Sequence, residues 1–443
     1  MQVEAWLARA ARTVPEASAL ETSQGRLSYA ELWDAARLAA AELARRGAEP
    51  GEQVAIALPA GIDFAVVLHA CLLLGAVAVP VDMRLTPAER ERTTARARVL
   101  VEAPLIMPVQ TSSQSAVSGT HELEDVCAII HTSGTTSAPR PVELTCGNFL
   151  WSAIGSGVAL GVDPHERWLC TLPLAHVGGL SILLRSAIYG TTAVIHERFD
   201  TERVLTALEQ QDITLVSLVA TTLVRLLDAG LRKPPALRHA LTGGGPVPNS
   251  LMRRARALGV PVTPTYGLTE ACSQVSTAGP PLFCTRVGID PSGEILVAGP
   301  TVAPASLAGD GWLHTGDIGS LDDDGLLSVS GRATDTIVSG GENISPSEVE
   351  AALESHPDVL EAAVIPRGDE RWGEAVSAIV VLRGDRSAPG HVFPPSPPAG
   401  VVEAELRAHC AERLAPFKVP KSVTVRTTPL PRTRSGKLLR REL

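Results

Sequence analysis

A loop of glycine and hydroxyl residues has the composition of a phosphate-binding site. The apolar run Val126–Ile130 predicts a buried strand. It leads into five such positions: Thr132, Ser133, Gly134, Thr135 and Thr136. Glycine lets backbone N–H groups approach a phosphate closely, and the hydroxyls supply further donors. Arg140 and Pro141 stand where a Walker loop requires a lysine and a hydroxyl residue. The loop therefore predicts a nucleotide-phosphate site that is not an ordinary P-loop, with a solvated turn as the alternative.

A second group of residues, Tyr266-Gly267-Leu-Thr269-Glu270, follows an expected strand at Val260–Val262. The tyrosine ring can stack on adenine, and Thr269 can donate to an α-phosphate. The Glu270 carboxylate is the kind of oxygen ligand that Mg²⁺ prefers. The alternative for this group alone is a helix N-cap at Thr269. Three glycines upstream would let a ligand approach the backbone: Gly243, Gly244 and Gly245.

Two further positions carry charges suited to a nucleotide. Asp317, in His314-Thr-Gly-Asp317, offers a carboxylate for two ribose hydroxyls, although an aspartate after glycine is often a turn residue. Lysine is scarce, with only four among the 39 basic residues, and Lys437 is one of three near the C-terminus. Because lysine is a compact, mobile point charge that arginine does not replace, Lys437 is a candidate for a specific role.

Composition limits the class of protein. With 443 residues, 45% hydrophobic and 20% charged, the chain predicts two or more folded domains. A net charge of −9 argues against nucleic acid as a partner. Seven cysteines without a CxxC pair predict buried free thiols in a reducing cytoplasm. Met1–Thr13 predicts an amphipathic helix without a signal sequence, and Phe64–Val81 predicts a buried helix followed by a strand rather than a membrane span.

Apolar strand-like runs alternate with helical patterns through the first 330 residues, which predicts α/β units with partly parallel sheets. The expected strands include Gln53–Leu58, Val77–Val81, Trp168–Leu172, Ala193–His196, Leu215–Val219 and Ala240–Thr242. The expected helices include Tyr29–Arg46, Thr201–Gln210 and Thr222–Leu231. Short strands and turns after Leu282 predict an antiparallel subdomain. The C-terminal part has its own pattern, with helices expected at Ser347–Ser355 and Val402–Leu414 and a proline-rich loop at Ser387–Gly400.

Taken in order, these motifs resemble the adenylate-forming (AMP-binding) superfamily of acyl-CoA synthetases, adenylation domains and luciferases, over nearly the whole chain. The resemblance implies an α/β multidomain fold. A large N-terminal domain, residues 1–332, would contain two α/β subdomains and a small β subdomain. A small mobile α+β domain, residues 333–443, would carry the catalytic lysine. ATP, Mg²⁺ and CoA are the implied cosubstrates and ion.

The resemblance also implies roles for single residues. Arg332, in Gly331-Arg332, would contact the ribose beside Asp317, and Glu270 would hold Mg²⁺. Lys437, in Pro431-Arg-Thr-Arg-Ser-Gly-Lys437, would bridge the attacking carboxylate and the α-phosphate, neutralising charge where it develops. A loop in Ser339–Ile344 would line a tunnel for the CoA thiol arm, with a simple β-turn as the alternative; its candidate residues are Gly340, Gly341, Glu342 and Asn343. The chain departs from the family pattern at Ser137, Arg140, Pro141 and Thr334.

The stretch Leu172–Gly190 is similar to o-succinylbenzoate–CoA ligases of menaquinone biosynthesis, as are the segments around Gly244 and Thr269. His176 could pack against an aromatic acid. Ser181 and Arg185 are four residues apart on one helix face, and the arginine could hold a second, non-reacting carboxylate. The alternative is a surface or interdomain arginine.

The chain is thus expected to be a cytoplasmic ligase of small molecules: an aromatic dicarboxylic acid, ATP and CoA. A homodimer is left open. Another aryl- or fatty-acyl-CoA ligase or a stand-alone adenylating enzyme is the first alternative. A catalytically silent nucleotide-binding protein is the second, although it would have no need to keep Lys437 and Glu270.

Overall fold

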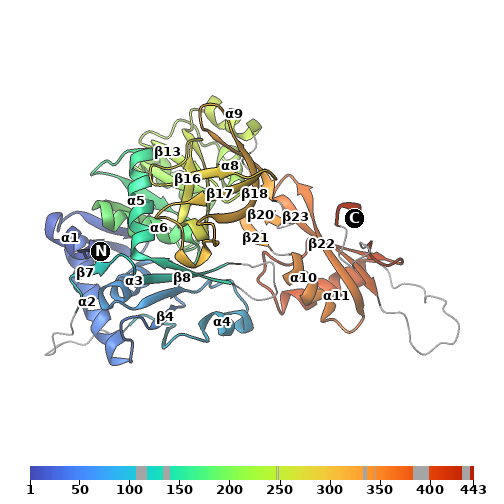
Figure 1. Ribbon diagram of the computed structural model, residues 1–443, viewed down its shortest axis with the longest axis horizontal. Coiled ribbons are helices and arrows are strands. Elements are labelled where there is room, and N and C mark those ends of the chain that lie inside the picture. The colour runs from blue at the N-terminus through green and yellow to red at the C-terminus, as the bar shows by residue number, and fades with distance from the viewer. Residues whose placement is uncertain are drawn as a thin grey trace. The chain divides into compact units, whose positions relative to one another are not determined.

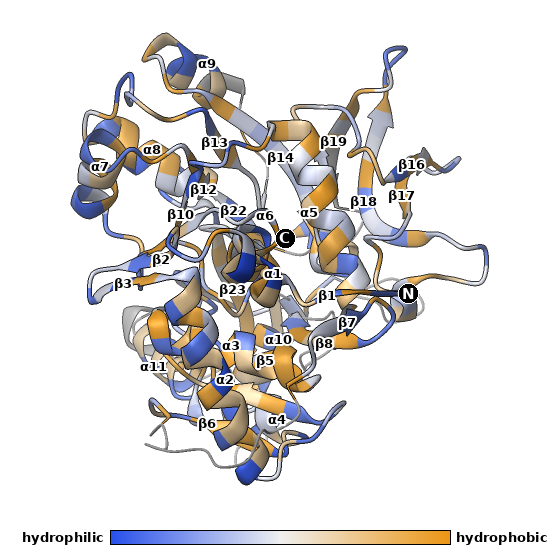
Figure 2. Cartoon of the chain, turned by 90° about the vertical axis from the view of Figure 1, so that its left-hand side faces the viewer, coloured by the Kyte–Doolittle hydropathy of each residue, from blue (hydrophilic) through white to orange (hydrophobic). Residues whose placement is uncertain are grey.

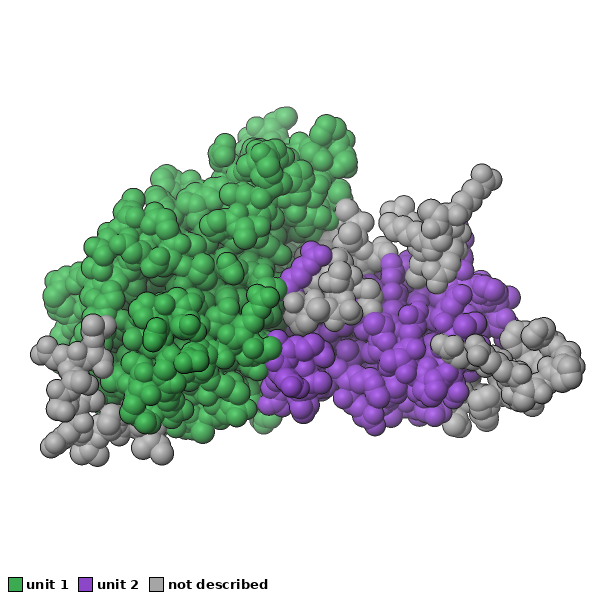
Figure 3. Space-filling model, turned by 60° about the horizontal axis from the view of Figure 1, so that its bottom comes forward, with its two compact units in different colours: residues 1–83, 93–132, 141–333 green, residues 84–92, 133–140, 334–443 purple. Residues whose placement is uncertain are grey.

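The structure is a computed structural model that describes residues 1–105, 117–132, 140–245, 247, 249–332, 337–344, 346–382, 399–431 and 440–443. The chain divides into two compact units, coloured separately in Figure 3. Unit 1 comprises Met1–Met83, Thr93–Thr132 and Pro141–Ala333; unit 2 comprises Arg84–Arg92, Ser133–Arg140 and Thr334–Leu443. The segment Arg84–Arg92, far from the C-terminus in sequence, therefore groups with the C-terminal residues.

Unit 1 is built on an eight-stranded sheet whose central strands are parallel, as alternating strands and helices predict. Its order is β15-β14-β13-β12-β10-β11-β2-β3, with antiparallel strands at both edges. The strands are β15 (Ser273–Thr277), β14 (Val262–Leu268), β13 (His239–Thr242), β12 (Leu215–Leu218), β10 (Arg167–Cys170), β11 (Thr192–Ile195), β2 (Ser18–Thr22) and β3 (Gly25–Ser28).

A second sheet of unit 1 has the order β6-β4-β5-β8-β9. Its strands are β6 (Val99–Val101), β4 (Gln53–Ile56), β5 (Val77–Pro80), β8 (Val126–Thr132) and β9 (Arg140–Thr145). Both of its faces are buried, since Val54 and Ile56 of β4 join the main core while Ala55 packs on the opposite side. Burial on both faces explains why β4, β5 and β8 contain apolar runs without alternation.

One hydrophobic core joins five helices to the eight-stranded and the five-stranded sheets of unit 1. The helices are α1 (Trp6–Thr13), α2 (Tyr29–Arg45), α3 (Ile62–Leu74), α5 (Cys146–Leu160) and α6 (Val177–Tyr189). A separate core covers the other face of the eight-stranded sheet with α7 (Thr201–Gln210), α8 (Ala220–Asp228) and α9 (Asn249–Ala257). Figure 2 shows hydrophobic and hydrophilic residues mixed on α7 and α9, as expected for helices with one side in water.

The predicted antiparallel subdomain is present as a four-stranded sheet, β16-β17-β18-β19. Its strands are β16 (Arg286–Ile289), β17 (Glu294–Ala298), β18 (Leu313–Leu321) and β19 (Leu327–Arg332). Short 3₁₀ turns lie at Thr269–Ala271 and Pro304–Ser306. The buried side chains of Val275, Ile295 and Val297 hold this sheet against β15.

Unit 2 contains a five-stranded sheet flanked by helices, seen in orange and red in Figure 1. The strands are β21 (Glu342–Ile344), β20 (Ile337–Ser339), β23 (Gly373–Leu382), β22 (Val359–Asp369) and β24 (Ser422–Arg426). Helices α10 (Pro346–Glu354) and α11 (Ala399–Ala411) pack on it, and a 3₁₀ turn spans Arg440–Glu442. Helix α4 (Pro87–Thr94) lies mostly in the segment that groups with this unit.

Local sequence signals explain several boundaries. Ser28 and Glu31 form a capping box at the start of α2, and Thr145 and Asn148 form another at α5. Asp200 caps α7, so the helix occupies the predicted span Thr201–Gln210. The run Phe64–Val81 gives α3 and β5, as predicted, and no helix in the described parts of the chain has the length and apolar character needed to cross a membrane.

Three expectations about secondary structure were wrong. Residues Gln2–Glu4 are not helical but form β1, which pairs with β7 (Thr120–Glu122), and the helix starts only at Trp6. The strand expected at Val260–Val262 begins at Val262 and runs to Leu268, because its residues Thr265–Leu268 pair with β15. Helix α11 begins at Ala399, inside the loop predicted for Ser387–Gly400, and ends at Ala411.

Candidate active site

Tyr266 and Asp317, two candidates for nucleotide binding, are in direct contact. The Tyr266 hydroxyl donates a hydrogen bond to Asp317 Oδ2 at 2.7 Å, and the Asp317 side chain is 5% exposed. Tyr266 lies on β14 of the eight-stranded sheet and Asp317 on β18 of the antiparallel sheet. A residue suited to adenine and one suited to ribose are therefore brought together from two sheets.

Arg332 lies opposite Asp317 in the backbone ladder. The register of β18 and β19 pairs Asp317 with Arg332. The two motifs that the family resemblance connects are thus cross-strand neighbours. This proximity follows from the hairpin, because its strands are joined by the turn after Leu321.

Glu270 lies on the turn that joins β14 to β15. The ladder has a bulge between Tyr266 and Gly267, and a Cβ atom at Gly267 would come within 1.6 Å of the Ser273 carbonyl oxygen. Glycine is therefore required there. The Glu270 carbonyl accepts a hydrogen bond from the Ala303 N–H at 2.8 Å. The bulge and this bond fix the backbone from which Thr269 and Glu270 project.

The three upstream glycines follow β13, whose last residue, Thr242, pairs with Pro264 of the parallel strand β14, two residues before Tyr266. Gly243 is buried, and its N–H donates to the Leu218 carbonyl at 3.1 Å. Gly244 and Gly245 are exposed. Ligands of open α/β sheets bind outside the carboxyl ends of parallel strands, and the glycines and the tyrosine both lie there.

Of the phosphate loop, the structure describes only the two ends. Thr132 is the half-buried last residue of β8, and Arg140 is the exposed first residue of β9. Ser133, Gly134, Thr135 and Thr136 lie outside the described residues, as does Lys437. Their roles stay predictions.

His176 is the N-cap residue of α6, and its side chain is partly exposed to solvent. Its side chain is 43% exposed, and its Nε2 lies 3.8 Å from Asp82 Oδ2. Asp82 follows β5, so the pair links the end of a strand in the second sheet to the start of α6. Sequence reasoning missed Asp82, since nothing in its local pattern marks it.

Ser181 and Arg185 are buried on α6, with 1% and 3% exposure. The Ser181 hydroxyl has no hydrogen-bond partner within the described part of the chain. Burial lowers the pKa of the Arg185 guanidinium. Arg185 is therefore not a surface arginine, which was one part of the alternative.

The buried Arg185 side chain has few polar contacts. Nη2 donates to Ser152 Oγ at 2.9 Å, and the guanidinium carbon lies 5.6 Å from the centre of the Trp168 ring. Nε has no hydrogen-bond partner, and no carboxylate pairs with Arg185 among the residues that the structure describes. A buried cation costs free energy unless an anion compensates it. This arrangement suits a ligand that brings its own negative charge.

In unit 2, Gly340 and Gly341 form the turn of the hairpin β20–β21. Their φ angles are +60° and +85°, which glycine adopts without strain. A Cβ on Gly340 would meet the Trp372 ring at 2.9 Å. Glu342 Oε1 accepts from Arg84 Nη1 at 2.6 Å, a contact within unit 2. Asn343 follows on β21, where only its backbone is described.

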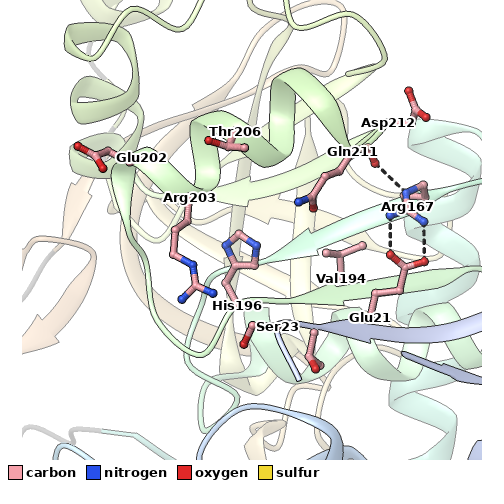
Figure 4. Close-up of a pocket in the computed structure, with 11 residues that line it drawn as sticks. Glu21, Ser23, Arg167, Val194, His196, Glu202, Arg203, Thr206, Gln211 and Asp212 are labelled. Atoms are coloured by element: carbon pink, nitrogen blue, oxygen red, sulfur yellow. Dashed lines mark hydrogen bonds and ion pairs between the residues drawn. The ribbon is translucent and has the colours of Figure 1, made fainter. Parts of the chain in front are cut away.

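A pocket of about 690 Å³ lies elsewhere in unit 1, between α7, the end of β11 and the β2–β3 hairpin. Figure 4 shows His196 and Arg203 beside each other and Arg167 in a bidentate ion pair with Glu21. None of the predicted site residues lines it. The glycines after β13 and Tyr266 on β14, which the motifs selected, therefore lie outside this pocket.

Two family profiles match the chain in order. The AMP-binding enzyme family matches residues 7–306, and the AMP-binding enzyme C-terminal domain matches residues 348–437. The 2-succinylbenzoate–CoA ligase of Bacillus licheniformis is 38% identical, covering 99% of this chain and 98% of the relative. That of Geobacillus kaustophilus is also 38% identical, covering 99% and 96%.

Solved structures agree with these relatives. A double mutant of o-succinylbenzoate CoA synthetase from Bacillus subtilis, bound to a product analogue, has a TM-score of 0.90 at 35% identity, covering 100% of this chain and 98% of that one. The enzyme in complex with its acyl-adenylate intermediate gives 0.72 at 35% identity with the same coverage. An amide bond synthetase from Marinactinospora thermotolerans gives 0.84 at 25%, covering 99% and 98%. With profiles over most of its length and full-length relatives above 30% identity, the chain belongs to the AMP-binding enzyme family.

Proposed function

We propose that this protein is an acid–thiol ligase of menaquinone biosynthesis. It converts 2-succinylbenzoate, ATP and CoA into 2-succinylbenzoyl-CoA, AMP and diphosphate through an acyl-adenylate. The observation that carries the proposal is the full-length likeness to 2-succinylbenzoate–CoA ligases at 38% identity. The solved Bacillus subtilis enzyme has been captured with ATP and magnesium ion and with the acyl-adenylate, the two states that such a reaction requires.

In the first half-reaction, an oxygen of the succinyl carboxylate attacks the α-phosphorus of ATP. The bond from that phosphorus to the bridging oxygen of the β-phosphate breaks, and diphosphate leaves. A carboxylate is a weak nucleophile and the phosphates repel it, so this step depends on positioning and on compensating charge. Lys437 supplies one mobile cation, and Thr269 donates to the α-phosphate.

The nucleotide is held where β14 and β18 meet. Tyr266 stacks on adenine, and Asp317 accepts from the ribose hydroxyls with Arg332 as its cross-strand neighbour. Glu270 would hold Mg²⁺, which supplies a positive charge to the phosphate oxygens. A carboxylate on a rigid turn fits such a hard cation, because the carbonyl of the same residue is tied to Ala303.

In the second half-reaction, the CoA sulfur attacks the acyl carbon of the adenylate. The bond between that carbon and the AMP oxygen breaks, and the thiol proton passes to solvent. The Gly340–Gly341 turn is the segment proposed to line the path of the thiol arm, because glycine lets a ligand approach the backbone closely. Residues 333–443 form the mobile domain. It brings Lys437 to the active site for the first half-reaction and the Gly340–Gly341 turn for the second.

The acyl pocket lies along α6. His176 packs against the aromatic ring, and Arg185 with Ser181 binds the ring carboxylate that does not react. The buried Arg185 has no carboxylate partner in the described structure, and the free carboxylate of 2-succinylbenzoate compensates its charge. A fatty acid or a simple benzoate would leave that cation without an anion, which disfavours the first alternative function.

We place the protein in the cytoplasm, with small molecules as its binding partners. All seven cysteines are free, and six are buried, which is consistent with a reducing cytoplasm. A homodimer stays a prediction from the sequence. The partners are the small-molecule substrates.

A substrate panel tests the function. The purified protein is incubated with ATP, Mg²⁺ and one acid at a time, and diphosphate release is followed with and without CoA. We expect release with 2-succinylbenzoate. Activity on benzoates or fatty acids but not on 2-succinylbenzoate would favour another acyl-CoA ligase, and no acid-dependent release would favour a silent nucleotide-binding protein.

A further inference from the structure

The hydroxyl of Ser152 connects two parts of the site. Ser152 lies on α5 and is 1% exposed. Its Oγ accepts a hydrogen bond from Arg185 Nη2 at 2.9 Å and donates one to the Cys272 carbonyl at 2.6 Å. None of the sequence motifs includes this residue, and its two partners lie 33 and 120 positions away.

The direction of both hydrogen bonds is fixed by chemistry. A guanidinium only donates and a carbonyl only accepts, so the serine must accept from Arg185 and give its one proton to Cys272. The hydroxyl therefore has no freedom to rotate while both partners are present. Its lone pair is directed at Nη2 and holds the guanidinium plane in one orientation.

The Cys272 carbonyl is itself held rigidly. Cys272 has a φ of +50°, an uncommon conformation for a residue with a side chain, and it is fully buried. Its N–H donates to the Thr269 carbonyl at 3.0 Å, closing the turn that carries Glu270. The acceptor that orients Ser152 thus belongs to the turn of the nucleotide site.

Arg185 depends on this contact more than an arginine with several partners would. Its only hydrogen bond to a described residue is the one to Ser152, and its Nε has no partner. The Trp168 ring, 5.6 Å from the guanidinium carbon, supports one side of the cation but supplies no directional bond. Removing the serine hydroxyl leaves the orientation of the guanidinium without a polar constraint.

We propose that Ser152 is a positioning residue that aims Arg185 at the non-reacting carboxylate of the acid substrate, using the turn that carries Glu270 as its fixed support. This inference rests on the proposed function, since it requires a dicarboxylate substrate. Ser152 does not touch the reacting atoms, and its effect is on the choice between a diacid and a monoacid.

The test compares two acids that differ only in the second carboxylate. 2-Succinylbenzoate has it, and 4-oxo-4-phenylbutanoate lacks it. For Ser152→Ala, we expect the ratio of kcat/KM for the diacid over the monoacid to fall about 10-fold, the range for losing a hydrogen bond to a charged group. The KM for ATP should stay within about 2-fold, because the turn that carries Glu270 keeps the hydrogen bonds of the Cys272 N–H and of the Glu270 carbonyl.

Two further variants separate positioning from packing. Ser152→Thr keeps the hydroxyl and should keep the preference for the diacid. Ser186→Ala is the matched control, since Ser186 is a buried serine next to Arg185 whose hydroxyl has no partner within the described residues. It should leave the ratio unchanged. If Ser152→Ala does not fold, Ser152→Cys carries the same test, because a thiol is a weaker acceptor of similar size.

The outcomes are distinct. An unchanged ratio in folded Ser152→Ala, or an equal loss with both acids, would overturn the role of Ser152 and leave the proposed function intact. Failure of the wild-type protein to use 2-succinylbenzoate would overturn the proposed function and, with it, this inference.

Discussion

The Tyr266 hydroxyl and the Asp317 carboxylate form a 2.7 Å hydrogen bond that joins β14 to β18 at the proposed nucleotide site. The bond aligns a buried carboxylate before any ribose reaches it. Pre-organisation of this kind lowers the cost of binding, since fewer groups must be ordered when the ligand arrives.

We expect Tyr266→Phe to raise the KM for ATP about 10-fold, the scale for losing a hydrogen bond to a charged acceptor, while the ring remains available for stacking. Steady-state kinetics at saturating acid measure this. Tyr189→Phe is the control, because Tyr189 donates to the Ala153 carbonyl, far from Asp317 in the chain. A KM for ATP unchanged in Tyr266→Phe would mean that the hydrogen bond does not prepare the ribose site.

Arg185→Met should separate stability from function. Removing a buried cation without a paired carboxylate should not lower the free energy of unfolding, and could raise it by about 1 kcal/mol. Addition of 2-succinylbenzoate should raise the Tm of the wild-type protein through linkage but not that of the variant. Thermal melting with and without the acid measures both effects. An equal ligand-induced shift in the two proteins would show that Arg185 does not bind the acid.

Lys418, another of the four lysines, has a structural role, in contrast to the catalytic role proposed for Lys437. It is buried, and its Nζ lies 3.2 Å from Glu89 Oε1 and 2.7 Å from Glu348 Oε1, all within unit 2. Lys418→Met removes the cation that contacts these two buried carboxylates, which should cost about 3–5 kcal/mol. Urea denaturation, monitored by hydrogen exchange of the α10 amides, measures the loss of stability in this unit. Arg407→Met, which removes an exposed ion pair at 4.0 Å, should cost far less; equal losses would contradict the assignment.

Acid should destabilise unit 1 through two buried histidines. Burial lowers the pKa of both His69 and His121 to about 4, from a usual value near 6.5. Between pH 6.5 and about 4 the unfolded chain therefore binds protons that the folded chain does not. The stability is complete above pH 6.5 and is lost as the pH falls, by about 1.4 kcal/mol per pH unit for each histidine.

His121→Gln should flatten this dependence. His121 Nε2 accepts from the Trp6 backbone N–H at 3.3 Å, and a glutamine oxygen can accept in its place without titrating. Urea unfolding at a series of pH values between 4 and 7 gives the slope for each protein. A variant that loses stability as steeply as the wild type would exclude His121 from the effect.

Lys437→Ala should lower adenylation by about 10²–10³-fold, the scale for removing one electrostatic contact in a transition state. Thioester formation from supplied acyl-adenylate should survive, because the second half-reaction does not need the same cation. Rates of the two half-reactions, measured separately, provide the test. Equal loss in both would remove the catalytic role from Lys437.

The sequence was sufficient where local signals were strong. Asp200 caps α7, and the predicted helix Thr201–Gln210 is the observed one. It failed where a distant partner decides the structure. Gln2–Glu4 form a strand because Thr120–Glu122 supply the hydrogen bonds, and β14 continues to Leu268 because β15 lies beside it. No pattern within a short window contains that information.

In the candidate site too, local patterns selected residues, but contacts between distant segments could not be predicted. Motif spacing was enough to select Tyr266 and Asp317 as candidates for nucleotide binding, yet their hydrogen bond depends on two sheets meeting. Arg185 was selected with a surface role as the alternative, and only the packing of α5 on α6 shows that it is buried against Ser152. Residues that act through contacts made by folding have no signature of their own in the chain.

The most direct test of the central claim is identification of the product. The protein is incubated with 2-succinylbenzoate, ATP, Mg²⁺ and CoA, and the mixture is analysed by mass spectrometry. We predict the CoA thioester of 2-succinylbenzoate together with one AMP for each thioester formed. Absence of that thioester under conditions in which another acid gives its own CoA ester would contradict the account.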